Sequence, residues 1–218
     1  TWSAKWVGND TMMRAAVSPS SPRDDFEVVE ALWQLFDEAD IVVAHNGDKF
    51  DIKKMNARFF LSGLPEPSSY RSVDTLKIAK RKFAFTSNRL DYISKITGGP
   101  GKVSHEGFKM WRKCLDGDAE ALQAMQDYND GDVIELERIY LEMRGWDHLH
   151  PNLGVYSETE EMICPNCGSD DVEPTGKFRT TQTAKYATHR CGNCGKISHS
   201  GQATPQVKPK EALVRPSK

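Results

Sequence analysis

The sequence predicts an α/β fold followed by a small second domain, and two features carry that prediction. The first is a strand, a turn and a helix in direct succession over residues 41–60, IVVAHNGDKFDIKKMNARFF. Its opening residues, Ile41 to Ala44, are β-branched or small and apolar, which is typical of a buried strand. The second feature is a pair of C-x-x-C motifs near the carboxyl end.

The central segment is expected to present polar side chains where its strand ends. The turn ends at Gly47, and glycine adopts a positive φ at little cost. Beyond the turn, Ile52, Met55 and Phe59 recur at helical spacing. Asp51 is therefore expected near the start of a helix and at the carboxyl end of a strand, where open α/β sheets bind their ligands.

The residues before this segment predict a hairpin and a helix. Residues 1–7 alternate and are rich in aromatic side chains, residues 8–10 suit a turn, and residues 12–17 can form the partner strand. Asp24 or Asp25 can cap the helix that follows. Its apolar stripe is expected to pack in the core and consists of Phe26, Val29, Leu32, Trp33 and Phe36.

The residues after it predict a second strand and three helices. A strand over residues 70–73 leads to Asp74 and a helix over 75–82, and another helix starts at about residue 88. His105 and Trp111 are expected in a loop. A long helix then runs from residues 116–118 to about Met143.

Near the middle of that long helix stand Tyr128 and Asp132, four residues apart. This spacing puts a phenol and a carboxylate on one helical face. Gly131 lies between them and costs the helix roughly 1 kcal/mol relative to alanine. A local irregularity or a close backbone approach is therefore expected at Gly131.

Four of the five cysteines form two pairs, Cys164 with Cys167 and Cys191 with Cys194. Each pair is followed by a glycine that lets the backbone turn around the thiolates. This spacing favours one tetrahedral Zn²⁺ in a reducing compartment over disulfides. Because four cysteines fill such a site, His189 and His199 are expected to be surface residues.

The net charge of −2 hides an asymmetry. Residues 174–218 carry nine Lys and Arg against one acid, Glu211, whereas the remainder is acidic. This pattern indicates contact with nucleic acid, with a merely solvated tail as the alternative. Residues 201–218 are expected to be disordered. Between the cysteine pairs, basic and aromatic groups mix as they do in single-strand binders: Lys177, Arg179, Lys185, Tyr186, His189 and Arg190.

Three motifs in order resemble those of 3′–5′ exonucleases of the DEDDy type, a branch of the ribonuclease H-like superfamily. They are N-x-x-x-F-D at residues 46–51, V-D-T-L at 73–76 and Y-x-x-x-D at 128–132. The likeness covers about residues 1–200 and extends to phage and bacterial proteins that join this domain to a zinc ribbon. It implies a ribonuclease H-like mixed sheet flanked by helices over residues 1–157, a zinc ribbon over 158–200 and a disordered basic tail over 201–218.

The resemblance also implies hydrolysis of phosphodiester bonds in single-stranded nucleic acid, DNA being favoured. Four carboxylates in that family hold two Mg²⁺ or Mn²⁺ ions about 4 Å apart. The resemblance makes Asp51 and Asp132 metal ligands and gives Tyr128 the role of orienting the attacking water. It implies that Asn46 contacts the terminal nucleotide and that Phe50 packs near it.

One family motif is missing. The first motif, D-x-E on the first strand, supplies two of the four carboxylates, and nothing before Ile41 offers it. The resemblance implies a structural role for Asp74, and the remaining acids fall in a predicted turn or helix start: Asp10, Asp24, Asp25 and Glu27. We therefore expect the first strand to be absent from this chain. A truncated chain, a split gene whose second polypeptide supplies the strand, and a decayed domain that only binds are the alternatives.

Two functional classes follow. The first is an exonuclease whose ribbon grips nucleic acid, and the second is a non-catalytic module that binds nucleic acid or a DNA polymerase. The expected partners are single-stranded nucleic acid, a DNA polymerase and a polypeptide that carries the first motif. No apolar run approaches the roughly 20 residues of a membrane span, so a cytoplasmic protein of a bacterial or phage-infected cell is expected.

Overall fold

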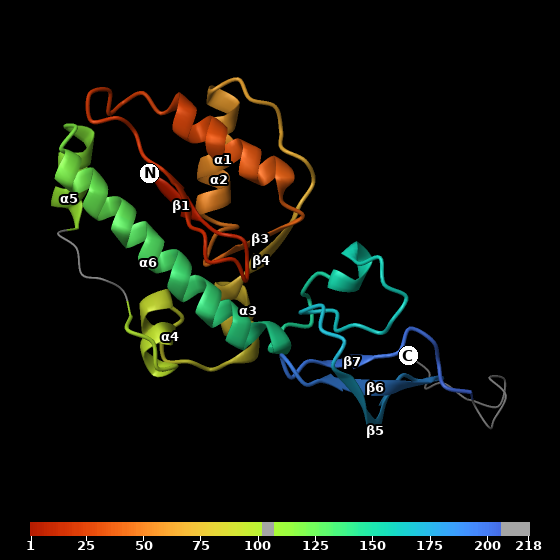
Figure 1. Cartoon of the computed structure of the whole chain (residues 1–218). Coiled ribbons are helices and arrows are strands. Elements are labelled where there is room, and N and C mark those ends of the chain that lie inside the picture. The colour runs from red at the N-terminus through yellow and green to blue at the C-terminus, as the bar shows by residue number, and fades with distance from the viewer. Residues whose placement is uncertain (102–106, 206–218) are drawn as a thin grey trace, which may run out of the picture. The chain divides into compact units, whose positions relative to one another are not determined.

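The computed structural model describes residues 1–101 and 107–205. The chain divides into two compact units, unit 1 over Thr1–Met143 and unit 2 over Arg144–Lys218 (Figure 1). Residues 144–157 thus belong to the second unit, although the sequence analysis assigns them to the first domain. His105 and residues 206–218 of the expected disordered tail lie outside the described residues.

Unit 1 is a mixed α/β domain, which confirms the predicted class. Its strands are β1 (Trp2–Ala4), β2 (Met13–Ala15), β3 (Ile41–Ala44) and β4 (Arg71–Asp74). Its helices are α1 (Phe26–Glu38), α2 (Asp51–Leu61), α3 (Thr75–Lys82), α4 (Leu90–Ile96), α5 (Phe108–Leu115) and α6 (Ala119–Met143). Strands β1 and β2 form an antiparallel hairpin, and β3 and β4 pair in parallel with Ala44 opposite Asp74.

The parallel pair β3–β4 is covered on both faces (Figure 1). Val42 packs against a cluster from α1 and α2 that contains Phe36 and Phe59. The alternate residues Ile41 and Val43 pack against a second cluster, built from β4, α3, α4 and α6. Because successive strand residues point to opposite faces, a strand buried on both sides is apolar throughout. This layering explains the continuous apolar run of β3.

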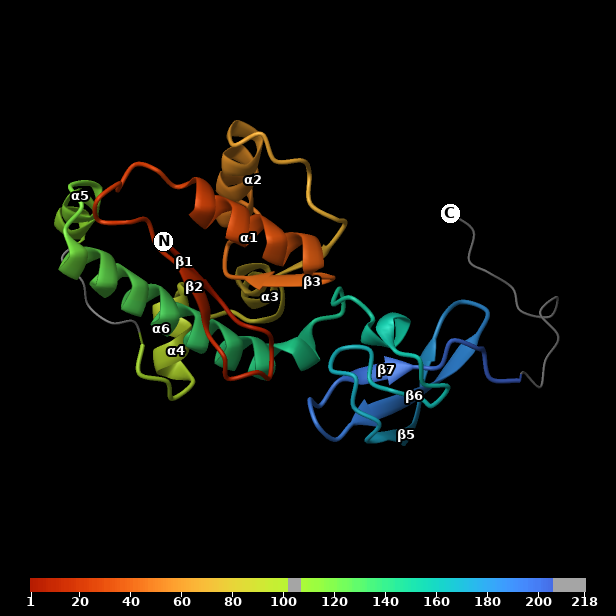
Figure 2. The ribbon, with the colours of Figure 1, turned by 45° about the horizontal axis from the view of Figure 1, so that its top comes forward.

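The hairpin β1–β2 lies along α6 (Figure 2). Gln126 on α6 donates from Nε2 to the backbone oxygen of Trp2 at 3.1 Å and to the hydroxyl of Ser3 at 2.7 Å. Asp130, one turn further along α6, accepts hydrogen bonds from Ser3 and Arg14. Polar residues of α6 therefore hold the hairpin in place.

Two expectations for this unit are wrong. Trp111 lies in helix α5, where the sequence analysis predicts a loop. The helix is short, and the large side chains Phe108 and Leu115 are exposed on it, so its pattern does not mark a core helix. Gly131 causes no irregularity, because α6 is continuous through it and an added Cβ would meet nothing within 4 Å.

Unit 2 contains a three-stranded antiparallel sheet in the order β5-β6-β7. The strands are β5 (Val172–Thr180), β6 (Lys185–Cys191) and β7 (Ile197–His199), and two short 3₁₀ helices precede them, η1 (Arg144–Trp146) and η2 (Leu153–Tyr156). One cysteine pair comes before β5 and the other joins β6 to β7. Within the part of the chain that the structure describes, no helix is apolar and long enough to cross a membrane.

Candidate functional site

The turn after β3 is held by a buried carboxylate. Asp74, at the end of β4, is 5% exposed, and its Oδ1 accepts hydrogen bonds from the backbone N–H groups of Asn46 at 2.9 Å and Leu76 at 3.0 Å. The first bond fixes the turn, and the second caps helix α3. These bonds agree with the structural role expected for Asp74.

The conformation of this turn corrects the sequence analysis. The positive φ, 67°, belongs to Asn46 and not to Gly47. Asparagine is one of the few residues that adopts this region readily. Gly47 is required for a different reason, because a Cβ there would lie 2.4 Å from the Cβ of Ala44. The glycine thus permits close packing between the turn and the strand.

His45 ties the same turn to two further elements. Its Nε2 lies 3.0 Å from the backbone oxygen of Asn88, and its Nδ1 lies 2.9 Å from the hydroxyl of Thr75. A carbonyl oxygen only accepts hydrogen bonds, so Nε2 is the donor to Asn88. The end of β3 is therefore fixed to the start of α3 and to the segment before α4.

The candidate catalytic residues lie on two helices of unit 1. Asp51 is the first residue of α2 and is exposed, and Phe50 before it is 53% exposed. The ammonium group of Lys54 lies 5.6 Å from the centre of the Phe50 ring. Tyr128 and Asp132 are half-buried and lie one turn apart on α6. The helix thus puts the phenol and the second carboxylate on one face, as their spacing predicts.

These two carboxylates do not form a metal site by themselves. We searched residues 1–101 and 107–205 for three or more His, Cys, Asp or Glu residues whose ligand atoms lie within 4.8 Å of one another. Four cysteines meet this criterion. Neither Asp51 nor Asp132 belongs to such a group. Two divalent ions need more anionic ligands than this pair supplies. The described residues therefore do not fit a two-metal centre without further carboxylates.

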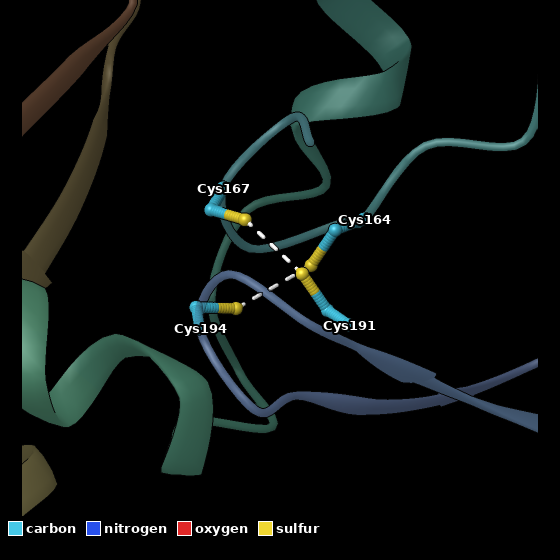
Figure 3. Close-up of side chains that lie close together, drawn as sticks. All are labelled: Cys164, Cys167, Cys191 and Cys194. Carbon is cyan, nitrogen blue, oxygen red and sulfur yellow. Dashed lines mark hydrogen bonds between the residues drawn. The ribbon is translucent and has the colours of Figure 1, made fainter. Parts of the chain in front are cut away.

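The four cysteines, in contrast, form a closed cluster (Figure 3). The Sγ atoms of Cys164 and Cys194 lie 3.6 Å apart, as do those of Cys167 and Cys191. Four thiolates at the usual Zn–S distance of about 2.3 Å in a tetrahedron would lie about 3.8 Å apart. The separations exclude disulfides, whose sulfur atoms lie about 2.05 Å apart. The donor set therefore fits one Zn²⁺.

The two cysteine pairs lie in two separate turns of the same backbone conformation. Gly168 donates its N–H to the oxygen of Cys164 at 2.9 Å, and Gly195 donates to the oxygen of Cys191 at 3.0 Å. Both glycines have a positive φ, 73° and 72°. Burial raises the pKa of the Cys164 thiol. Zinc is bound by thiolates, so zinc binding at these cysteines would release protons.

The segment over residues 144–147 packs on both cysteine turns, which the sequence analysis misses. The side chain of Asn166 is 2% exposed and donates from Nδ2 to the backbone oxygens of Arg144 and Asp147. Lys196, after the second pair, also donates to the oxygen of Asp147, at 2.6 Å. The one sequence signal for this contact is Asn166 within the first C-x-x-C motif, because an asparagine amide can donate hydrogen bonds to backbone oxygens.

Comparisons with known proteins agree with the α/β architecture. A protein-family model described as the RNase_H superfamily matches residues 6–144. A DNA polymerase III of the PolC type from Ureaplasma parvum serovar 3 is 45% identical over 72 residues, which is 33% of this chain and 5% of that polymerase. The chain thus spans a small part of that relative's length. No solved structure matches the chain.

Proposed function

The chain belongs to the RNase H superfamily, and from that premise we propose that it forms most of a metal-dependent 3′–5′ exonuclease of the DEDDy type. The observation that carries the proposal is the family match over residues 6–144, which includes the three motifs in the order of that branch. The relative is a DNA polymerase, which favours single-stranded DNA as the substrate.

The proposed roles follow the motifs. With the missing carboxylates supplied, Asp51 and Asp132 would help to hold Mg²⁺ or Mn²⁺, and such ions would activate water and stabilise the leaving oxygen. Tyr128 orients the attacking water, and Asn46 and Phe50 bind the terminal nucleotide. Three features support these roles: the exposed position of Asp51 at a helix start, the exposed ring of Phe50, and the shared face of Tyr128 and Asp132.

We propose that the missing carboxylates come from a strand carrying D-x-E, either in a preceding segment or in a second polypeptide. Among the described residues, β1 pairs only with β2, and β3 pairs only with β4. Each of these strands therefore has a hydrogen-bonding edge that no other described strand occupies, and a further strand could pair with it. Strand addition to such an edge satisfies backbone groups and fixes the register of the added side chains.

The test supplies that strand. The zinc-loaded chain is incubated with single-stranded DNA labelled at its 3′ end and Mn²⁺, with and without a polypeptide that carries an apolar strand ending in D-x-E. We expect little or no cleavage by the chain alone. With the strand, we expect cleavage from the 3′ end that EDTA stops and that Asp132→Ala abolishes.

Vigorous cleavage by the chain alone that is lost in Asp132→Ala would contradict the incomplete-site proposal. The missing carboxylates would then have to be sought among Asp10, Asp24, Asp25, Glu27 and Asp74. Cleavage that never appears with any strand would favour the second candidate, a module that binds nucleic acid or a DNA polymerase without hydrolysis. The small number of carboxylates at the site is the observation in favour of that candidate.

We further propose that the four cysteines bind one structural Zn²⁺ and that unit 2 is a zinc ribbon. The support is the closed donor set and the matching turns around the two pairs. A module of this size cannot build a large apolar core, so metal–thiolate bonds supply much of its stability.

A further inference from the structure

The sheet of unit 2 sorts the basic and aromatic residues between the cysteine pairs onto two faces. Residues paired directly across antiparallel strands point to the same face. Tyr186 on β6 pairs with Arg179 on β5, and Thr188, two residues further along β6, pairs with His199 on β7. Arg179, Tyr186 and His199 therefore share one face. The opposite face carries Phe178, Lys185 and His189.

His199 contacts both Tyr186 and Arg179, and we call these three residues the aromatic platform. The rings of Tyr186 and His199 have centroids 5.5 Å apart and are tilted by 56°. The guanidinium group of Arg179 donates a hydrogen bond to Nε2 of His199. Nδ1 of His199 lies 2.9 Å from the backbone oxygen of Ser200. Since that oxygen can only accept, Nδ1 carries the proton and Nε2 is left to accept from Arg179.

The platform faces solvent and keeps donors for a ligand. Arg179 and His199 are exposed, and Tyr186 is half-buried. A guanidinium group has five N–H donors, and the bond to His199 uses one of them. The neighbouring Arg190 on the same face stands opposite an acid, Glu173. Arg179 instead stands opposite the neutral Tyr186, so its charge faces no acid across the strand pair.

We propose that the aromatic platform binds single-stranded nucleic acid, with a base stacked on Tyr186 and His199 and the adjacent phosphate bonded to Arg179. This inference rests on the proposed function, because it states how unit 2 holds the single-stranded substrate. Single strands expose base faces that a duplex hides, and every base can stack on an aromatic ring. Arginine supplies the fork of donors that phosphate oxygens accept.

The test measures binding by the zinc-loaded chain with fluorescence anisotropy and no added Mg²⁺ or Mn²⁺, so that cleavage does not contribute. The probes are oligothymidylate, oligouridylate of equal length, a DNA duplex and an abasic oligonucleotide. Tyr186→Ala should weaken binding of both single strands by about fivefold or more and leave binding of the abasic strand unchanged. Arg179→Ala should weaken binding of every probe and reduce the slope of log Kd against log salt by about 0.7 on single strands.

Two matched controls lie on the opposite face of the sheet. Phe178→Ala removes an exposed aromatic ring and should leave all the dissociation constants unchanged. Lys185→Ala removes one positive charge and should weaken binding less than Arg179→Ala does. Tyr186→Phe keeps the ring and should bind as the unmodified chain does. If Tyr186→Ala fails to hold zinc, Tyr186→Leu keeps the apolar bulk without the aromatic face and replaces it.

The inference is overturned if Tyr186→Ala and Tyr186→Leu bind oligothymidylate as tightly as the unmodified chain. It is also overturned if Tyr186→Ala weakens binding of the abasic strand as much as binding of oligothymidylate, since a charged patch for any polyanion would explain that result. The outcome is separable from the proposed exonuclease activity. If Tyr186→Ala weakens binding but no added strand restores cleavage, the platform is supported and the exonuclease activity is overturned. If an added strand restores cleavage but Tyr186→Ala binds normally, the activity is supported and the platform is overturned.

Discussion

Asp74 and Asn46 are joined by a hydrogen bond from the backbone N–H of Asn46 to the carboxylate of Asp74, and this bond fixes the turn that leads to Asp51. Asn46 adopts a positive φ there, a conformation that costs free energy for most residues. The same carboxylate oxygen caps α3. An acid next to the proposed catalytic site can therefore be needed for structure without binding metal.

Substitution of Asp74 separates these two roles. Asp74→Asn keeps an oxygen that can accept both hydrogen bonds, whereas Asp74→Ala leaves two backbone donors unsatisfied. We expect Asp74→Ala to lower the free energy of unfolding by about 1–3 kcal/mol and Asp74→Asn to lower it by less. Chemical denaturation followed by far-UV circular dichroism measures both changes. If Asp74→Asn folds normally but abolishes the cleavage restored by an added strand, Asp74 is a metal ligand after all.

Zinc binding gives the second prediction. The purified chain should contain one Zn²⁺, and Cys167→Ser should lose it because the fourth thiolate is gone. Cys114→Ser is the matched control, since Cys114 lies outside the cluster and should keep the full zinc content. Elemental analysis of the folded proteins is the measurement. A content well below one ion per chain, or equal loss in both variants, would refute the proposed site.

Two glycines give opposite predictions for the same substitution. At Gly145, an added Cβ would lie 2.0 Å from the backbone oxygen of Cys194, so Gly145→Ala must displace the second cysteine turn. We expect this to lower the stability of unit 2 by about 1–3 kcal/mol. At Gly131, a Cβ meets nothing within 4 Å inside a helix, so Gly131→Ala should stabilise unit 1 by about 0.5–1 kcal/mol.

Thermal unfolding measures both changes. Zinc release reports on unit 2, and helical circular dichroism reports on unit 1. The described α-helices all lie in unit 1, so the second signal reports that unit. A stabilised Gly145→Ala protein would show that the segment over residues 144–147 does not pack on the cysteine turn in solution.

The sequence predicted those features that depend on local pattern. The strand at Ile41 to Ala44, the helix that begins at Asp51 and the long helix with Tyr128 and Asp132 follow from apolar periodicity, and the structure contains all three. The four cysteines also cluster as their spacing predicts. The strand and the helices follow from neighbours in the sequence, and the cysteine cluster follows from two short motifs that suit one metal ion.

The features that the sequence did not predict depend on contacts between distant residues. Asn46, which has the positive φ, donates its N–H to Asp74 at the end of β4, and Gly47 is needed because it approaches Ala44. Asn166 binds backbone some twenty residues earlier, which no periodic pattern reveals.

The third motif gives a prediction about catalysis. In an enzyme completed by the missing strand, Asp132→Ala should abolish cleavage because it removes a proposed metal ligand. Tyr128→Phe should reduce the rate by a smaller factor, since it removes only the hydroxyl that orients water. Single-turnover cleavage of 3′-labelled DNA measures both rates. Asp127→Asn, on an exposed position of the same helix, is the control and should cleave normally. Equal, small effects of Asp132→Ala and Tyr128→Phe would mean that the third motif is misplaced.

Asp48 gives a prediction about acid stability. It lies in the turn after β3, where its carboxylate accepts hydrogen bonds from Lys77 and Ser72. Burial acts to raise the pKa of Asp48, but the bonds from Lys77 and Ser72 and the charge of Lys77 outweigh it and lower the pKa below its usual value. A group with a depressed folded-state pKa stabilises the fold above its unfolded pKa of about 3.9 and loses this contribution as pH falls through the folded value.

Asp48→Asn should therefore lower the free energy of unfolding of unit 1 at pH 7, and the difference from the unmodified chain should shrink as pH falls below about 4. The side chain of Lys77 is 52% exposed, so solvent screens the pair and the effect at pH 7 should be only about 0.5–1 kcal/mol. Urea denaturation at a series of pH values, followed by helical circular dichroism, measures the difference. Asp10→Asn removes the same charge from an exposed turn and should change stability by less than about 0.5 kcal/mol. A difference for Asp48→Asn that grows on acidification would have the wrong sign and would show that Lys77 does not stabilise the charged carboxylate.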